Sequence, residues 1–210
     1  PDEFNPPQDH EFYGMSSMGY RDFRIGFLSV FHTLYEGWIA QNQIEDWMPD
    51  WMNQMDIQLT YSRDGRTWHR AGNREPVLNC GLRGCYDSGN VYPPHAPFVR
   101  DDEIWLYHGG SNELHGESPR YGEQPRRGIN LAKIEKDRLV GLRAAAQGVV
   151  TTAPLSIEPN ELWINAGASG GSLQVEIVDP FDRIVPGYGK DDCIPCAANE
   201  TAYRVKWKSQ

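Results

Sequence analysis

Apolar and polar residues alternate over several short stretches of the chain, and long helical periods are scarce. The clearest stretch is 55–61, Met-Asp-Ile-Gln-Leu-Thr-Tyr, in which every second side chain is apolar. Since successive side chains of a β-strand point to opposite faces, this pattern predicts a strand with one buried face. Residues 62–65 contain Asp-Gly and predict a hairpin turn, because this pair tolerates the positive φ of tight turns.

The first group of predicted strands forms a four-stranded meander. Its strands are expected at 10–18, 23–31, 55–61 and 66–70. Residues 36–54, which include three Trp, interrupt the alternation and are expected to form a loop with a short helix.

A second group of strands follows after residue 90. A Pro-rich extended segment at 91–99 is expected to pair with 103–109 across a turn at 100–102. Residues 127–134 are expected to form a hairpin with 139–142. Two consecutive four-stranded units of similar length are typical of the blades of a β-propeller.

From about residue 149 the predicted strands become shorter. They are expected at 151–157, 162–165, 172–178, 184–185 and 203–207. Turns separate these strands at the spacing of a β-sandwich. The sequence therefore predicts an all-β chain of two domains, with β-propeller blades in 1–147 and a β-sandwich, complete or incomplete, in 148–210.

Composition excludes several classes of protein. The 210 residues are 39% apolar and 23% charged, which is typical of a globular chain rather than a disordered one. No run of 18 apolar residues exists, so no membrane-spanning helix is predicted. The net charge of -9 argues against nucleic acid as a partner, because a phosphate backbone needs a basic face. The first residue is Pro, so we expect either a removed signal peptide or a piece of a longer chain.

The four cysteines form two close pairs, Cys80 with Cys85 and Cys193 with Cys196. Such pairs predict local disulfides in an oxidising compartment, and hence a secreted or periplasmic protein. Buried thiols are the second interpretation. A four-thiolate zinc site is a weaker one, because only the second pair has the Cys-x2-Cys spacing. No cofactor is expected.

Residues capable of chemistry concentrate in the earlier part of the chain. All six His lie at or before His115, and five of the seven Trp lie at or before Trp105. We therefore expect recognition or catalysis in the first domain and a supporting role for the second. An alternative is that propeller blades use more aromatic residues in their packing.

The segment 61–68, Tyr-Ser-Arg-Asp-Gly-Arg-Thr-Trp, is similar to the Asp-box of sialidases. In that motif Asp64 would cap the turn and Trp68 would pack between blades. Together with 87–94 and 103–115, it resembles bacterial proteins related to the five-bladed β-propeller glycoside hydrolases that cleave fructans and arabinans. The stretch 148–207 resembles the β-sandwich that follows such propellers.

The resemblance implies three carboxylates at the mouth of a central channel, on the innermost strands of the early blades. The Asn-Asp-Pro stretch usual in the first blade is absent. Two blades also cannot close a ring, and unpaired edges would remain. The chain therefore resembles the last blades plus the sandwich, with the missing blades in a removed part or a partner chain. Part of the catalytic set would then lie outside this sequence.

Glycoside hydrolysis needs two carboxyl groups across the scissile bond. The catalytic candidates are Asp87 and Glu11, each near the start of a blade, and Glu113 in a loop after a strand. Asp87 has an ordinary alternative as a turn cap, and Glu113 has one as a solvated loop residue.

The substrate-binding candidates fall into three chemical types. The imidazoles suit sugar hydroxyls or a cation, the aromatic rings suit stacking on a sugar, and the guanidinium suits a carboxylated sugar. They are His95, His108, His115, Tyr92, Trp105 and Arg24.

These observations support three hypotheses of function. The leading one is a secreted, glycoside hydrolase-like protein that binds or hydrolyses a polysaccharide at the propeller channel. The second is a non-catalytic carbohydrate-binding or assembly subunit, whose open edges pair with another chain. The third and weakest is a hydrolase with a metal among His95, His108 and His115.

Overall fold

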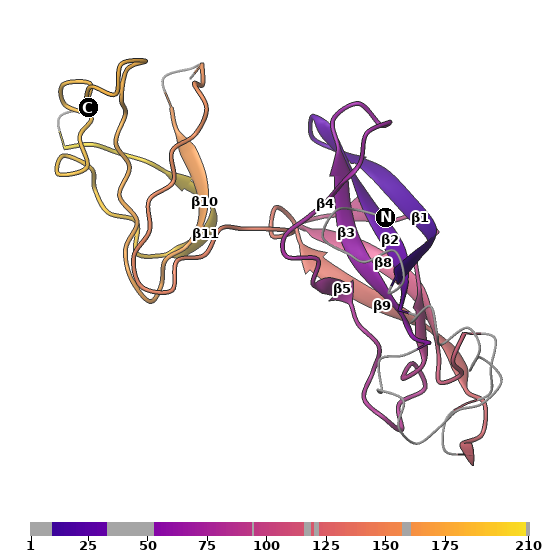
Figure 1. The fold of residues 1–210 in the computed structure, drawn as a ribbon. Helices are drawn as coiled ribbons and strands as arrows, with labels where there is room; N and C mark the ends of the chain where they lie inside the picture. Colours follow the sequence, from indigo (N-terminus) through magenta and orange to yellow (C-terminus); the bar gives the residue numbers. More distant parts are fainter. Residues whose placement is uncertain are drawn as a thin grey trace. The chain divides into compact units, whose positions relative to one another are not determined.

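The computed structural model describes residues 10–32, 53–93, 95–115, 119, 122–156 and 161–208. Within these residues the chain is all-β, with strands and turns but no α-helix, and none of them forms a helix that could span a membrane. The chain divides into two compact units, Pro1–Val140 and Gly141–Gln210, and each is described by itself (Figure 1).

The first unit begins with three long antiparallel strands, β1 (His10–Tyr20), β2 (Phe23–His32) and β3 (Met55–Ser62). The two-residue strand β4 (His69–Arg70) returns along β3 after the hairpin turn. The predicted four-stranded meander is therefore confirmed, although its last strand is shorter than expected. The loop and helix predicted at 36–54 lie almost entirely outside the described residues.

Strand β3 is buried on both faces, whereas its alternating sequence predicted one buried face. Met55, Ile57 and Leu59 are buried on one side. The polar Asp56 and Gln58 alternate with them and are also buried. Buried polar side chains are stable only when they are hydrogen-bonded. The second face of β3 is therefore the place to look for a polar site.

The turn after β3 is held by Asp64, as the resemblance to an Asp-box implied. Its Oδ1 accepts hydrogen bonds from the backbone amides of Arg66 at 2.8 Å and Thr67 at 2.7 Å, and from the Ser62 hydroxyl at 3.0 Å. These hydrogen bonds hold the pKa of Asp64 well below its usual range. Trp68 lies over strand β2, since a Cβ added to Gly26 would lie 2.9 Å from the Trp68 ring.

The second group of strands is built around β8 (Glu103–Ser111). Two short strands, β6 (Asn90–Tyr92) and β7 (Phe98–Arg100), pair with opposite ends of β8. Strand β9 (Arg127–Glu135) pairs with β8 over its whole length. The predicted pairing of 91–99 with 103–109 is thus confirmed as two separate strands.

The hairpin predicted between 127–134 and 139–142 is wrong. Residues 139–142 form no strand, and β9 pairs with β8 instead. This register places Ile104 opposite Ile134 and Leu106 opposite Ala132, so that apolar side chains of both strands meet the core. As a partner for β9, the nine-residue strand β8 offers more hydrogen bonds than the four-residue segment 139–142.

One sheet joins the two groups of strands. Strand β3 meets β6 through a parallel bridge between Met55 and Asn90, and β5 (Pro76–Leu78) pairs with β3 nearby. The resulting order is β1-β2-β3-β6-β8-β7, with β4 and β5 also on β3 and β9 on β8. The core takes side chains from both groups: Phe27, Ile57, Leu59, Val91, Ile104 and Leu106. Within the described residues this sheet is open, so the propeller assignment remains a prediction.

A polar contact ties the two ends of the first unit together. The Tyr20 hydroxyl donates to Asp137 Oδ1 at 2.6 Å, and Arg21 donates to both carboxylate oxygens of Asp137. Asp137 lies in the turn after β9 and has a positive φ of 64°. The contact fixes the end of β1 to the end of β9.

The second unit contains one two-stranded sheet, β10 (Trp163–Gly167) with β11 (Asn199–Arg204). Isolated bridges supplement it, including one between Cys193 and Trp207. Trp207 is buried, and its indole donates to the Val175 carbonyl at 3.1 Å. This unit is β-rich with its own small core, and a two-sheet sandwich remains a prediction.

The disulfides predicted from the cysteine pairs are not formed, since all four cysteines are free thiols. Cys80 Sγ is turned inward, 3.2 Å from the Met55 carbonyl oxygen, whereas Cys85 is exposed. Cys193 and Cys196 are both buried. Cys193 Sγ accepts a hydrogen bond from the Val175 amide at 3.3 Å. The second interpretation of the cysteines, that they are buried thiols, is therefore correct for Cys193 and Cys196.

Candidate functional site: a polar pocket on the first sheet

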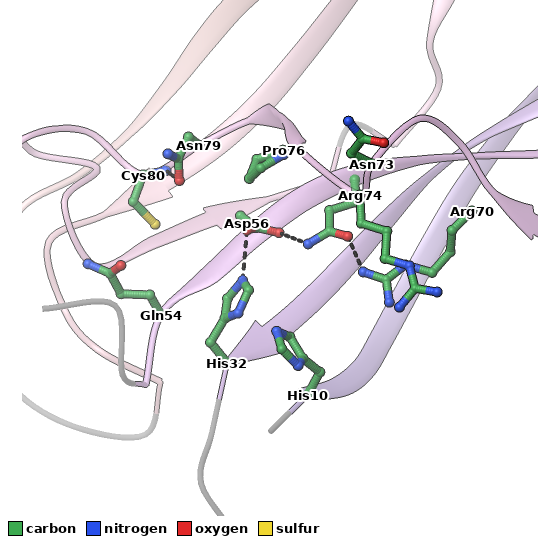
Figure 2. A pocket seen from close by; sticks show the side chains of 11 residues that line it. His10, His32, Gln54, Asp56, Arg70, Asn73, Arg74, Pro76, Asn79 and Cys80 are labelled. Carbon is green, nitrogen blue, oxygen red and sulfur yellow. Dashed lines mark hydrogen bonds and ion pairs between the residues drawn. The ribbon is translucent and has the colours of Figure 1, made fainter. Parts of the chain in front are cut away.

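A pocket of about 440 Å³ lies in the first unit, along strands β1 to β5 and the turns between them (Figure 2). Its volume falls within the range of small-molecule sites. Most of its lining side chains are polar: His10, His32, Gln54, Asp56, Gln58, Arg70, Asn73, Arg74, Pro76, Asn79 and Cys80.

A row of hydrogen-bonded side chains crosses this pocket. His32 Nε2 lies 2.7 Å from Asp56 Oδ2, and Gln58 Nε2 donates to Asp56 Oδ1 at 3.1 Å. Arg70 then donates to Gln58 Oε1. We call His32, Asp56, Gln58 and Arg70 the polar row; Figure 2 labels His32, Asp56 and Arg70 and marks the hydrogen bonds of the row with dashed lines.

The strand register explains why these four residues meet. Asp56 and Gln58 are two positions apart on β3, so they project from the same face. Val30 is opposite Asp56 on β2, which brings His32 next to the carboxylate. Thr60 is opposite Arg70 on β4, which places the guanidinium beside Gln58. The row is therefore a direct product of antiparallel pairing.

A second imidazole lies beside the row. His10 is the register partner of His32, and their ring centroids are 4.7 Å apart at 75°. When Asp56 is ionised, His32 Nε2–H donates to it. The other ring nitrogen of a neutral His32 is then an acceptor.

Cys80 lines the pocket with a thiol that burial keeps in its protonated form. Burial raises the pKa of its thiol to about 12, and the charges of Asp56 and Asp87 contribute to this rise. Because the thiolate is the reactive form, this cysteine stays inert at neutral pH. Its thiol is turned to the backbone carbonyls of Met55 and Gly89.

The described lining of the pocket is rich in hydrogen-bonding side chains and poor in carboxylates. Among the described residues that line the pocket, Asp56 is the only one with a carboxylate, and only 5% of its surface is exposed. These described residues supply no second carboxyl group of the kind that glycoside hydrolysis needs. Among the described residues no three His, Cys, Asp or Glu side chains are grouped to hold a metal ion. The amide, guanidinium and imidazole groups instead offer many fixed donors.

None of the three predicted catalytic carboxylates lines the pocket. Glu11 is exposed on β1, on the face opposite His10. Asp87 lies in a turn, where its carbonyl accepts the Gly81 amide at 3.1 Å. Glu113 forms an ion pair with Arg127, and this pairing holds the pKa of Glu113 below its usual range. A carboxyl with a lowered pKa is a poor general acid.

Two predicted sugar-stacking residues lie on a different surface, the solvent side of β6 to β9. We call this surface the aromatic face; its exposed or half-exposed members are Tyr92, Phe98, Trp105, Tyr107, Ile129 and Leu131. The rings of Phe98 and Tyr107 lie at 24° with centroids 6.5 Å apart. Two cations cover Trp105, with Lys133 Nζ 4.3 Å and the Arg100 guanidinium carbon 4.7 Å from its ring centroid.

The remaining predicted binding residues are scattered. His108 is buried on the core side of β8, and His95 is exposed between β6 and β7. His115 packs against the rings of Tyr13 and Phe31, with centroids 4.5 and 4.7 Å away. Arg24 is exposed on β2. The three predicted histidines, His95, His108 and His115, therefore do not form one site.

Sequence reasoning missed the pocket. The available signal was the pair of polar residues, Asp56 and Gln58, at alternate positions of a strand whose other positions are apolar. By itself that alternation predicts a solvent-facing side. Only the pairing of β3 with β2 and β4 shows that these polar groups meet His32 and Arg70.

Comparison with known proteins adds little. No protein-family model matches the sequence, and no curated protein matches it significantly. A solved structure of a BT0996 RGII complex matches 62% of this chain with a TM-score of 0.41 and 16% sequence identity. The match spans about a third of that protein, 35% of its length. A similarity of this size does not establish a shared fold.

Proposed function

We propose that this protein binds carbohydrate, and that the polar pocket is its glycan site. The observation that carries the proposal is the polar row along the pocket, in which His32, Asp56 and Gln58 hold one another in fixed orientations. Sugar hydroxyls both donate and accept, so a preorganised set of imidazole, amide and guanidinium groups suits them.

Binding is favoured over hydrolysis by the carboxylates. The hydrogen bonds of Asp56 go to His32 and Gln58, and the ion pair with Arg127 keeps Glu113 ionised. In the hydrolytic form of the proposal, a second carboxyl comes from another part of the chain or from a partner. The two strand groups are then blades of a propeller, the second unit is a sandwich, and the protein is secreted or periplasmic.

The aromatic face favours a second candidate function, assembly with another protein chain. Tyr107 is 51% exposed and Ile129 82% exposed, on the solvent side of the sheet. Contiguous exposed apolar groups of this kind mark interaction surfaces. This candidate and the first use different faces and can be separated by substitution.

Affinity measurements with matched variants test the proposal. The wild-type chain is titrated with a panel of oligosaccharides, and Gln58→Ala is compared with Arg24→Gln, an exposed position outside the pocket. We expect Gln58→Ala to weaken binding about tenfold, because it removes a link of the polar row. Failure of the wild type to bind any glycan, or equal loss in both variants, contradicts the proposal.

A further inference from the structure

Strand β9 is long and exposed on both of its faces. On the aromatic face Ile129 is 82% exposed and Leu131 is exposed beside it, and Asn130, which points to the other face, is exposed as well. Of the strands that the structure describes, β8 is the one that pairs with β9. The edge of a sheet presents backbone N–H and C=O groups to which a further strand can pair.

The hydrogen bonds to β8 show which backbone groups of β9 point away from it. Just beyond one end of the pairing, the Asn112 amide donates to the Arg126 carbonyl at 3.1 Å. Just beyond the other end, the Lys136 amide donates to the Asp102 carbonyl at 2.8 Å. Hydrogen-bonded and outward-pointing residues alternate in an antiparallel pair. The even-numbered positions of β9 therefore bond to β8, and its odd-numbered positions turn their N–H and C=O groups outward.

The charges at these odd-numbered positions are self-complementary. Arg127 is the first residue of β9, Glu135 is the last, and Leu131 is at the centre. When two copies of β9 pair antiparallel about Leu131, Arg127 of each copy lies opposite Glu135 of the other. A shift of two residues in one direction would oppose Arg127 to Lys133, and a shift in the other direction would move Arg127 past the end of the strand. Because like charges directly opposite each other are destabilising, the charges favour the centred register.

Both charged ends of β9 remain accessible. The Arg127 side chain is 76% exposed although it pairs with Glu113, and a guanidinium has donors for a second carboxylate. Glu135 is opposite Glu103 on β8, a like charge, and its side chain is 61% exposed with Arg138 Nε 3.9 Å away. A guanidinium placed opposite Glu135 from outside the sheet would therefore improve its electrostatic surroundings.

We infer that β9 pairs antiparallel with β9 of a second copy of this chain, forming a two-fold dimer in which one sheet continues through both copies. The inference names the partner for the assembly function proposed above, and it does not depend on the glycan site. The contact is isologous, since each copy offers the same strand. Charged residues on an edge ordinarily discourage strand pairing, but the order of charges along β9 favours pairing with itself.

Sedimentation velocity over a series of concentrations tests for the dimer. Wild type is compared with Glu135→Lys and with the control Glu75→Lys, the same change at an exposed position before β5. We expect the wild type and the control to dimerise equally. Glu135→Lys should weaken dimerisation about tenfold or more, because it opposes like charges at both symmetric positions. Thermal melting shows that each variant is folded.

Cross-linking tests the register. The background is Cys85→Ser, which removes the exposed thiol. In the centred register, Leu131→Cys places two thiols directly opposite each other with Cα atoms about 5.5 Å apart, within the range of a disulfide. Ile129→Cys is the matched control, since the two copies of that position would be four residues apart along the strands, about 14 Å. We expect mild oxidation to give covalent dimers from Leu131→Cys and far fewer from Ile129→Cys.

The outcomes separate the inference from the proposed functions. A wild-type chain that stays monomeric at every concentration overturns the inference and leaves both the glycan site and assembly with a different chain standing. A dimer that Glu135→Lys does not weaken overturns the β9 contact, and equal cross-linking of the two cysteine variants overturns the register. Dimerisation as expected, in a chain that binds no glycan, overturns the glycan site and supports the inference.

Discussion

The polar pocket and the aromatic face belong to the same unit, but they differ in burial and in the kind of side chain that they present. The pocket holds buried polar side chains, each fixed by a neighbour on the next strand. The aromatic face presents exposed apolar side chains, with the rings of Phe98 and Tyr107 close together and two cations over Trp105. Hydrogen bonds are directional and select a ligand by its functional groups. The hydrophobic effect is non-directional, so exposed apolar area favours contact with any apolar surface of fitting shape.

The difference has an energetic origin. A buried carboxylate such as Asp56 is tolerated only because its partners are in place. Its presence in a sheet that could have been filled by apolar residues points to a functional reason. The exposed Tyr107 and Leu131 carry the opposite cost, since their apolar area stays in water. Covering by a partner would remove that cost.

The largest expected effect is on stability, at the polar row. Asp56→Ala leaves His32 and Gln58 without their shared acceptor inside the protein, so we expect a loss of about 2–4 kcal/mol in the free energy of unfolding. Asp22→Ala is the control, because 77% of that side chain is exposed. Urea denaturation measures both, and a small, equal change in the two variants would sink the idea of a buried network.

The next effect concerns Gly89, which precedes β6 and packs against the backbone that follows β8. A Cβ added to Gly89 would overlap the backbone carbonyl of Glu113, which cannot move aside as a side chain could. Gly89→Ala should therefore cost about 1–3 kcal/mol, whereas Gly19→Ala, with nothing within 4 Å, should cost little. Thermal melting compares the two. Equal melting temperatures would mean that β6 is not held against the loop after β8.

Substitution of the aromatic face should leave the pocket untouched. Tyr107→Ser combined with Leu131→Ser removes exposed apolar area, and we expect less than about 1 kcal/mol of lost stability. Glycan affinity should stay at the wild-type value, while any self-association measured by light scattering should fall. A loss of glycan binding in this variant would move the glycan site to the aromatic face.

The thiols offer a kinetic contrast within the first unit. With a pKa of about 12, only about one Cys80 in ten thousand is a thiolate at a pH near 8. Iodoacetamide should therefore modify the exposed Cys85 well before Cys80, as followed by mass spectrometry of the folded chain. Modification of Cys80 as early as that of Cys85 would contradict the burial of the Cys80 thiol and its raised pKa.

The smallest effect concerns acid stability. Arg21 and Tyr20 hold the pKa of Asp137 below its usual range, so this pairing stabilises the fold above the ordinary aspartate pKa of about 4. The contribution is lost as the pH falls through the lowered value. Asp137→Asn should flatten the fall of the melting temperature below about pH 4. The change is small because Arg21 is largely exposed; an unchanged pH profile contradicts the pairing.

Local patterns were enough to predict most strands of the first unit, although β5 was missed and the predicted strand at 139–142 does not form. The alternation in 55–61 and the Asp-Gly turn after it depend only on neighbouring residues, and β3 and the Asp64 turn were found where expected. Pairing is less local. The hairpin between 127–134 and 139–142 was the shorter connection, yet β9 pairs with β8, where its apolar side chains meet the core.

The candidate site could not be predicted from the sequence, because it also depends on which strands pair. His10, His32 and Asp56 come from three strands, and only their register brings them together. The carboxylates chosen by chemistry, such as Glu11 and Asp87, had no pairing information behind them. The aromatic residues Tyr92 and Trp105 were found on an exposed surface, although the cations over Trp105 could not be anticipated.

The most direct test of the glycan site is a crystal soaked with the oligosaccharide that binds best in solution. We expect sugar density in the polar pocket, within hydrogen-bonding distance of His32 and Gln58. Density confined to the aromatic face, or an empty pocket at a saturating concentration of that ligand, would contradict the assignment of this pocket.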